Sequence, residues 1–253
     1  MKVFLSGLEA SGEFHQINEM IPKYKYILCS YYYLKQDIFE TILNKSELMI
    51  IDSGAHSFQK GKKVDWVEYT KKYAEWIKNN DCDKIVGYFE MDVDNVIGYD
   101  KVLELRKILE SASNKIIPVW HKNRGIEEYK NMCRQYSGKV IAVTGFKNED
   151  IQDHQYLMFL KYAKKYNCKV HCLGMTRKKI LDTVPFDYVD SSSWKQASIY
   201  GKIGNKKVTK EFSKENRYIV MAESFKLNMK MQEHYYKKWQ HICKDWVVSQ
   251  NLL

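Results

Sequence analysis

With 253 residues, the chain is long enough for one large core, and no Gly/Ser-rich linker, internal repeat or low-complexity tract divides it. Its formal net charge of +10 at pH 7 favours an acidic partner, nucleic acid first. The sequence shows no secretory signal, no apolar run of about 18 residues and no CxxC pair, so we expect a soluble cytoplasmic protein with reduced cysteines and no membrane partner.

Eight short apolar runs recur along the chain, and most intervals between them leave room for a helix. Each run is too short for a buried helix, and several are rich in β-branched residues, which favours strands buried on both faces. The runs are Val3–Leu5, Tyr26–Tyr32, Leu48–Ile51, Ile85–Phe89, Ile116–Trp120, Val140–Val143, Val170–Leu173 and Tyr188–Val189.

Amphipathic segments with a helical period fill most of these intervals. In one of them, Val102, Leu105 and Leu109 follow the three-four spacing of a single buried face. Eight alternations of strand and helix predict an α/β protein with a (β/α)8 TIM barrel over residues 1–196, and an open doubly wound sheet is the alternative. The clearest helical segments are Trp66–Asn79, Asn95–Ala112, Ile126–Tyr136 and Ile151–Tyr166.

The last part of the chain, residues 197–253, does not continue this alternation. Ala197–Lys210 is rich in glycine and lysine, which predicts a basic loop or hairpin. Met221–Ser249 has the pattern of one or two helices. We expect this short, mainly helical extension to pack on the outside of the barrel or to close one of its ends.

Acidic side chains follow several of the predicted strands. Asp52 ends the third strand, Glu90 and Asp92 follow the fourth, and Asp190 ends the eighth. Because the carboxyl ends of barrel strands share the face that carries active sites, we expect Asp52 and Asp190 to face each other across one pocket. The chain has no nucleophilic Ser or Cys elbow and no glycine-rich phosphate loop. A pair of carboxylates then suits a reaction at a glycosidic carbon, where one acid attacks and the other handles the proton.

Basic residues cluster directly after the same strand ends. A barrel places these loops on the face of the active site, so the positive charge would ring the mouth of the pocket. With such a rim, the sugar of the glycosidic bond would belong to a nucleotide. The residues predicted to bind nucleic acid are Lys60, Lys62, Lys63, Lys122, Arg124, Arg177, Lys178 and Lys195.

Four sequence blocks at these strand ends resemble, in order, the tRNA-guanine transglycosylases (queuine tRNA-ribosyltransferases) and their DNA-acting relatives in phages and bacteria. The first, DSGAHSFQ at Asp52–Gln59, resembles the family's DSGG-[FY]-Q block with the second glycine replaced. In the second, Asp92 within YFEMDVD is similar to the aspartate that binds the edge of the base, although Glu90 is a rival.

The third and fourth blocks lie in the second half of the barrel. Pro118–His121 through Ala142–Gly145 is similar to the family's VQGG-then-LR stretch, with histidine where glutamine is usual. The family's H-x-LG…ILxxV…FDxxD pattern is matched by HCLG, Ile180, Leu181, Val184 and FDYVD, which begin at His171 and end at Asp190.

The resemblance implies a covalent mechanism on a guanosine that is flipped out of a polynucleotide. Asp190 would be the nucleophile at the anomeric carbon, and Asp52 would be the general acid/base toward the leaving and incoming bases. Guanine would be exchanged for a 7-deazaguanine, with no cofactor. The implied substrate-binding residues are Asp92 or Glu90, Ser53, His121 and the backbone of Gly145, with Leu173 and His56 or Phe58 against the faces of the base.

The chain departs from the family's tRNA enzymes after Asp190. Those enzymes carry a CxCxxC zinc site with a downstream histidine and a long C-terminal extension, whereas this region holds Cys243, His234 and His241. We therefore expect no structural zinc and no other metal. In this respect the chain is more similar to the phage DNA-modifying branch, so DNA is favoured over tRNA as the substrate.

Three other functions remain open on the sequence. The first is a transglycosylase that acts on tRNA, and the second is a barrel that binds nucleic acid without catalysis. The third is a metal-dependent hydrolase that uses His56, His121, His171 and Asp52. The sequence also leaves open which 7-deazaguanine enters, and whether the chain acts alone, as a homodimer or with an accessory protein.

Overall fold

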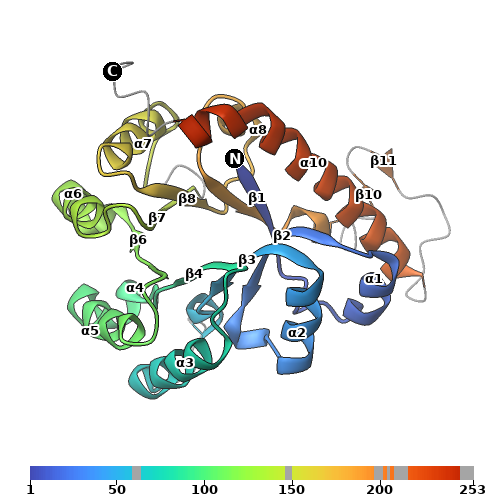
Figure 1. Cartoon of the computed structure of the whole chain (residues 1–253), viewed down its shortest axis with the longest axis horizontal. Helices are drawn as coiled ribbons and strands as arrows, with labels where there is room; N and C mark the ends of the chain where they lie inside the picture. The colour runs from blue at the N-terminus through green and yellow to red at the C-terminus, as the bar shows by residue number, and fades with distance from the viewer. Residues whose placement is uncertain (59–63, 146–149, 197–201, 204–205, 208–215, 246–253) are drawn as a thin grey trace.

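The computed structural model describes residues 1–58, 64–145, 150–196, 202–203, 206–207 and 216–245. One parallel sheet forms its centre and curls into a nearly closed barrel with helices around it (Figure 1). The strands of this sheet are β1 (Lys2–Ser6), β2 (Tyr24–Ser30), β3 (Ser46–Asp52), β4 (Ile85–Phe89), β5 (Ile116–Ile117), β6 (Val119–Trp120), β7 (Val140–Thr144), β8 (Lys169–Leu173) and β9 (Tyr188–Ser191).

The barrel closes at a single apolar run, Ile116–Trp120. Strand order is β5-β4-β3-β2-β1-β9-β8-β7-β6, and all pairs in it are parallel. Pro118 separates β5 from β6 because it has no N–H to give to a ladder. β5 pairs with β4 and β6 pairs with β7, so the two edges of the sheet meet at this run. The eight predicted runs are therefore the eight strand positions of the barrel, and the predicted (β/α)8 fold is confirmed.

Helices alternate with the strands as the periodicity predicts, with two differences in detail. The predicted helix over Asn95–Ala112 is broken at Gly98, whose φ of +82° is a left-handed conformation that ends one helix before the next begins. The predicted helix over Ile151–Tyr166 begins only at Tyr156, after a 3₁₀ turn. The α-helices are α1 (Phe14–Met20), α2 (Gln36–Lys45), α3 (Trp66–Asn80), α4 (Asp94–Ile97), α5 (Tyr99–Glu110), α6 (Gly125–Gln135), α7 (Tyr156–Lys164), α8 (Lys178–Leu181) and α10 (Arg217–Asp245).

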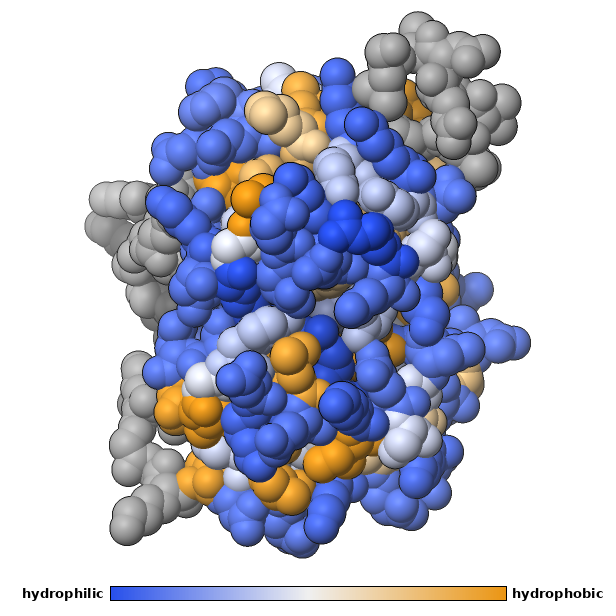
Figure 2. All heavy atoms as spheres, turned by 90° about the vertical axis from the view of Figure 1, so that its left-hand side faces the viewer, coloured by the Kyte–Doolittle hydropathy of each residue, from blue (hydrophilic) through white to orange (hydrophobic). Residues whose placement is uncertain are grey.

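Strand side chains alternate between the inside of the barrel and the surrounding helices. Phe4, Ile50, Phe89 and Tyr188 belong to the inner cluster, and the residues between them along each strand pack outward against the helices in two larger clusters. Each such side chain contributes roughly 1.5–3 kcal/mol on burial. The exterior over α5, α6 and α7 is mainly hydrophilic with scattered hydrophobic patches (Figure 2).

The C-terminal helix α10 takes the position of the eighth barrel helix, beside β1 (Figure 1). It runs from the carboxyl end of the strands, where Asn228 accepts from the Ser193 hydroxyl (3.0 Å), toward their amino ends. There the buried Gln232 donates to the carbonyls of Val3 (2.7 Å) and Tyr26 (2.8 Å), one on β1 and one on β2. The predicted C-terminal helix therefore packs on the outside of the barrel.

The predicted basic hairpin is seen in part. β10 (Lys202–Ile203) and β11 (Lys206–Lys207) pair antiparallel. The rest of Ala197–Lys210, and residues 246–249 of the predicted helix, lie outside the described residues. In the part of the chain that the structure describes, no helix is both long enough and apolar enough to cross a membrane.

Candidate active site

A ring of polar side chains lies at the carboxyl end of the barrel, and the alternation of the strands explains it. Every second residue of a strand faces the inside of the barrel, so the residue two positions after an inward-facing apolar side chain also faces inward. These positions are Asp52 after Ile50, His121 after Val119, Thr144 after Ala142 and Asp190 after Tyr188. Asp52 and Asp190 therefore lie at the same end of the barrel, close enough for the charge of Asp190 to act on Asp52.

Asp52 is a carboxyl group whose environment favours the protonated form. Burial is the main cause and raises its pKa to about 7. A hydrogen bond from the Gly54 N–H (3.0 Å) acts against this rise and lowers the pKa. The negative charges of Asp92, Asp190 and Glu9 raise it further. The protonated form is therefore populated near neutral pH. A carboxyl group in this state can both give and take a proton.

Local sequence fixes the turn that carries Asp52. Gly54 has a φ of +74°, and a Cβ on it would lie 2.4 Å from the Cβ of Tyr32. Only glycine fits both the conformation and the space. The DSG sequence at the end of β3 thus holds the Asp52 carboxylate against the Gly54 N–H at the mouth of the barrel.

Asp190 is held through one of its two oxygens. Oδ1 accepts hydrogen bonds from Nε2 of His171 (3.0 Å) and from the N–H of Gly174 (2.9 Å). No group in the described residues donates to Oδ2, and the side chain is 15% exposed. The carboxylate is therefore oriented by its first oxygen, while the second is available to a substrate.

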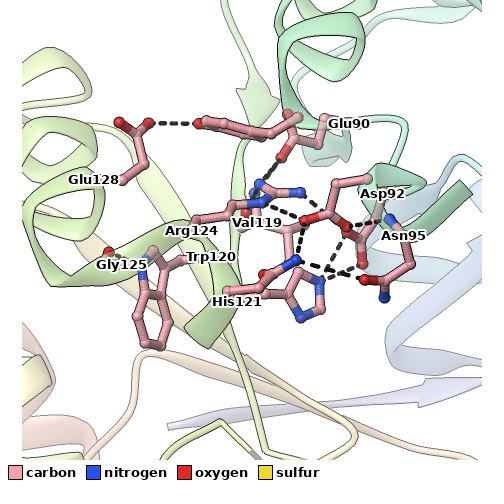
Figure 3. Close-up of polar contacts among 12 residues, drawn as sticks. Glu90, Asp92, Asn95, Val119, Trp120, His121, Arg124, Gly125 and Glu128 are labelled. Carbon is pink, nitrogen blue, oxygen red and sulfur yellow. Dashed lines mark hydrogen bonds and ion pairs between the residues drawn. The ribbon is translucent and has the colours of Figure 1, made fainter. Parts of the chain in front are cut away.

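His121 lies between two carboxylates, and Figure 3 shows its contact with Asp92. Its Nε2 contacts Asp92 (2.8 Å) and its Nδ1 contacts Asp150 (2.9 Å), which also accepts from Thr144. Burial lowers the pKa of His121, but these bonds and the charge of Asp92 outweigh it and raise the pKa to about 9. The imidazole is therefore cationic at neutral pH and donates from both nitrogens. While these bonds hold, neither nitrogen is left for the base that the resemblance assigns to it.

A buried ion network supports the same wall of the site (Figure 3). Glu90 is fully buried, and its Oε1 accepts from the N–H of Val119 (2.8 Å) and from Arg124 (3.0 Å). Its Oε2 accepts from Arg106 on α5. Arg124 also donates to Asp92 (3.3 Å) and Asp94 (3.0 Å).

This network corrects two expectations. Glu90 has both oxygens committed inside the protein, so it is not an alternative to Asp92 at the edge of a base. Arg124 is not part of the basic rim, because its side chain is 1% exposed and its guanidinium is surrounded by Glu90, Asp92 and Asp94. Three acids in reach of one guanidinium stabilise it in the interior, where it orients Asp92 instead of a phosphate.

Replacing Glu90 with glutamine is expected to lower the free energy of unfolding by about 3–5 kcal/mol, because Arg106 and Arg124 would lose the buried anion that they share. Chemical denaturation measures this loss. The matched control is Glu104→Gln on α5, where the partner is the exposed Lys101 and solvent screening leaves little stability to lose. A loss below about 1 kcal/mol for Glu90→Gln would contradict the assigned role.

One cluster of side chains in the described residues could bind a metal ion. Asp92, Asp94 and His121 each place one possible ligand atom within 4.8 Å of the others. Arg124 and His121 already donate to these carboxylates, so a metal ion would have to displace cations that belong to the protein. The set proposed for a hydrolase differs, since His56, His171 and Asp52 do not belong to this cluster.

The remaining residues implied to bind substrate are spread around the mouth. Ser53 is buried and its carbonyl accepts from the Tyr69 hydroxyl (2.7 Å), whereas His56 is exposed. Leu173 ends β8 and is half-buried. Its carbonyl accepts a hydrogen bond from the Gly145 N–H (2.8 Å), so this N–H is not available to a base. Phe58 ends a 3₁₀ turn, and its side chain lies outside what is described.

The predicted basic rim is partly described. Lys122 and Lys178 are exposed, Arg177 pairs with Asp153, and Lys195 is half-buried. Burial lowers the pKa of Lys195. The three residues Lys60, Lys62 and Lys63 lie outside the described residues.

Sequence reasoning missed three charged residues of this site. Arg106 lies four residues after Val102 on the apolar face of α5, and an arginine in such a stripe is a sign of a buried partner. Asp150, which orients His121, follows no strand directly and gave no such sign. Glu9, whose charge acts on Asp52, is buried after β1 and accepts from the N–H of Ser30 (2.9 Å).

The site therefore combines a carboxyl group that can transfer a proton, a carboxylate with one open oxygen, and an aspartate, Asp92, held by two cationic side chains. No protein-family model matches the chain, and no curated protein matches it. The resemblance to the transglycosylases stays a prediction that depends on the four sequence blocks.

Proposed function

We propose that the protein is a transglycosylase that exchanges guanine for a 7-deazaguanine in a polynucleotide, with DNA favoured. The observation that carries the proposal is the difference between two carboxyl groups at one barrel mouth. Asp52 has a pKa near 7, and Asp190 is a carboxylate with one oxygen held and one open. Two acids whose environments separate their roles in this way are what a glycosidic reaction requires.

In the first half of the reaction, Oδ2 of Asp190 forms a bond to C1′ of the target nucleoside. The C1′–N9 bond breaks, and its electron pair goes to the departing guanine. Asp52 supplies the proton that makes guanine a neutral leaving group. The product is an ester between Asp190 and the sugar of the polynucleotide.

In the second half, the incoming base takes the place of guanine. Asp52, now ionised, removes the proton from the ring nitrogen that will attack C1′. The new C–N bond forms as the bond from C1′ to the Asp190 oxygen breaks, which returns both acids to their starting states. A carboxyl group with a pKa near 7 suits this exchange because it gives and takes the same proton at neutral pH.

Asp92 is the group that would select guanine. The edge of guanine presents two adjacent donors, N1–H and the 2-amino group, and an ionised carboxylate can accept both. Asp92 is held by His121 and Arg124, and its side chain is 30% exposed at the mouth of the barrel. Adenine has an acceptor at N1 and no 2-amino group, so it would be rejected.

The polynucleotide substrate is argued from charge and from geometry. A base in a stacked duplex cannot enter a barrel mouth unless it is flipped out, and exposed cations such as Lys122 and Lys178 suit the flanking phosphates. DNA is favoured because the family's zinc-binding CxCxxC pattern, typical of its tRNA enzymes, is missing from this sequence.

Asp92→Asn is expected to lower kcat/KM for a guanine-containing polynucleotide about 100-fold. The asparagine oxygen can accept from one of the two donors of guanine, but its NH2 group would face the other donor and leave it without an acceptor. Steady-state incorporation of labelled guanine measures it. Asp150→Asn is the control, since it changes the other side of His121 without facing the base. An equal loss in both variants would assign the effect to His121 instead of base recognition.

The proposal is tested by incubating the protein with labelled guanine, and then with labelled 7-deazaguanines, in the presence of duplex DNA or unmodified tRNA. Label in DNA supports the proposal as stated. Label in tRNA alone would change the substrate to tRNA. Label in neither, together with salt-sensitive binding to either polynucleotide, would favour the non-catalytic alternative.

A further inference from the structure

His171 is a buried histidine with an unusual set of neighbours. Its side chain is 0% exposed and lies inside the barrel, with the ring of Phe89 edge-on at 5.1 Å and those of Phe4 and Tyr188 beyond 6 Å. Nε2 contacts Asp190 at 3.0 Å. Nδ1 is buried and has no hydrogen-bond partner in the described structure.

These contacts indicate which ring nitrogen carries the proton. A proton on Nδ1 would place a donor among aromatic rings with nothing to accept it, which is costly. A proton on Nε2 is accepted by Asp190. A ring with its proton on Nε2 therefore fits the surroundings, and it leaves Nδ1 as an unused acceptor.

A polar ring with one orphaned nitrogen is a poor choice for the stability of a barrel core. An apolar side chain of similar size would fill the space without an unsatisfied atom. The one polar contact that His171 makes is with the carboxylate to which we assign the attack on the sugar.

We infer that His171 is a positioning residue that holds Asp190 for reaction, an inference that rests on the proposed function. Together with the Gly174 N–H (2.9 Å), it fixes Oδ1, so that Oδ2 is the oxygen that bonds to C1′. In the ester, Oδ1 is the carbonyl oxygen. When the incoming base displaces the carboxylate, the same two donors stabilise the negative charge that returns to it.

Two substitutions separate positioning from packing. His171→Met fills the space without a donor, and we expect kcat for guanine exchange to fall about 10- to 100-fold with KM for the polynucleotide unchanged. The melting temperature should stay at or above that of the wild type. His171→Gln restores an N–H toward Asp190, so kcat should recover to within about tenfold of the wild type.

Opposite results would overturn the inference. Wild-type kcat in His171→Met would show that the bond to Asp190 is not needed. A melting temperature that falls together with kcat, with no recovery in His171→Gln, would assign His171 to the fold alone. The wild type is assayed alongside these variants. If it exchanges no base, the proposed function fails; if it does, the variants test the role of His171 alone.

A measurement without turnover tests the inference even if the wild type exchanges no base. The ¹⁵N NMR spectrum of histidine-labelled protein should show His171 with its proton on Nε2, and the signal should shift in Asp190→Asn, where an amide replaces the carboxylate. A proton on Nδ1, or a signal that does not respond to Asp190→Asn, would overturn the inference.

Discussion

Asp190→Asn is expected to reduce base exchange by at least about 10⁴-fold, the largest effect of any substitution proposed for this protein. Asparagine can still accept from His171 and Gly174 through its carbonyl oxygen, so the site keeps its shape. Its amide nitrogen, which replaces Oδ2, is not a nucleophile toward C1′. The rate of labelled guanine incorporation measures the loss, and the melting temperature shows that the fold is intact.

A neighbouring carboxylate provides the control for this variant. Asp187 is buried at the other end of β9, where it accepts from Lys164 (2.6 Å) and from the N–H of Val170 (2.8 Å). Asp187→Asn should lower stability, because Lys164 would lose its anion, and should leave kcat near that of the wild type. Exchange that survives in Asp190→Asn would remove Asp190 from the role of nucleophile.

Asp52→Asn is expected to slow guanine release by about 10²–10⁴-fold, because the variant has no proton to give to the leaving base. The pKa of about 7 adds a dependence on pH. Guanine release needs the protonated form, which is lost as pH rises through 7. The kcat/KM of the wild type should therefore be constant below pH 7 and fall about tenfold per pH unit above it.

The same group also makes the stability of the fold depend on pH. Its folded-state pKa of about 7 lies above the unfolded value of about 3.9, so its ionisation opposes folding as pH rises from 4 to 7. At pH 8, Asp52→Asn should unfold at the same or a higher denaturant concentration than the wild type. A wild-type rate that does not change between pH 6 and 9, or the same profile in Asp52→Asn, would contradict the acid/base role.

The barrel could be predicted from the sequence because its strands carry a strong local signal. Eight apolar runs of limited length, separated by amphipathic segments, leave few other ways to bury so much apolar surface. The same signal places Asp52 and Asp190 at the carboxyl ends of β3 and β9. Their shared location follows from the geometry of any parallel barrel.

The charge pairs of the site could not be predicted in the same way. Arg124 follows a strand end just as Lys122 does, yet one side chain is buried and the other is exposed. The difference depends on Glu90 and Asp94, which lie about thirty residues earlier in the chain and meet Arg124 only in the folded barrel. Spacing along a sequence carries no information about such pairs.

The contacts of single side chains could not be predicted from the sequence either. His121 looked like a group for the edge of a base, but Asp150 and Asp92 occupy both of its nitrogens. His171 matched the sequence pattern of the transglycosylases without a stated role. Its contact with Asp190 and its orphaned Nδ1 are visible only once the strands are in register.

The most direct test of the central claim is to trap the covalent intermediate and locate it. Protein incubated with a guanine-containing polynucleotide, denatured and digested, should yield one peptide with a sugar-linked nucleotide on Asp190, which mass spectrometry identifies by fragmentation. The account predicts this adduct in the wild type and its absence in Asp190→Asn. An adduct on another residue, or exchange that proceeds with no adduct at all, would contradict it.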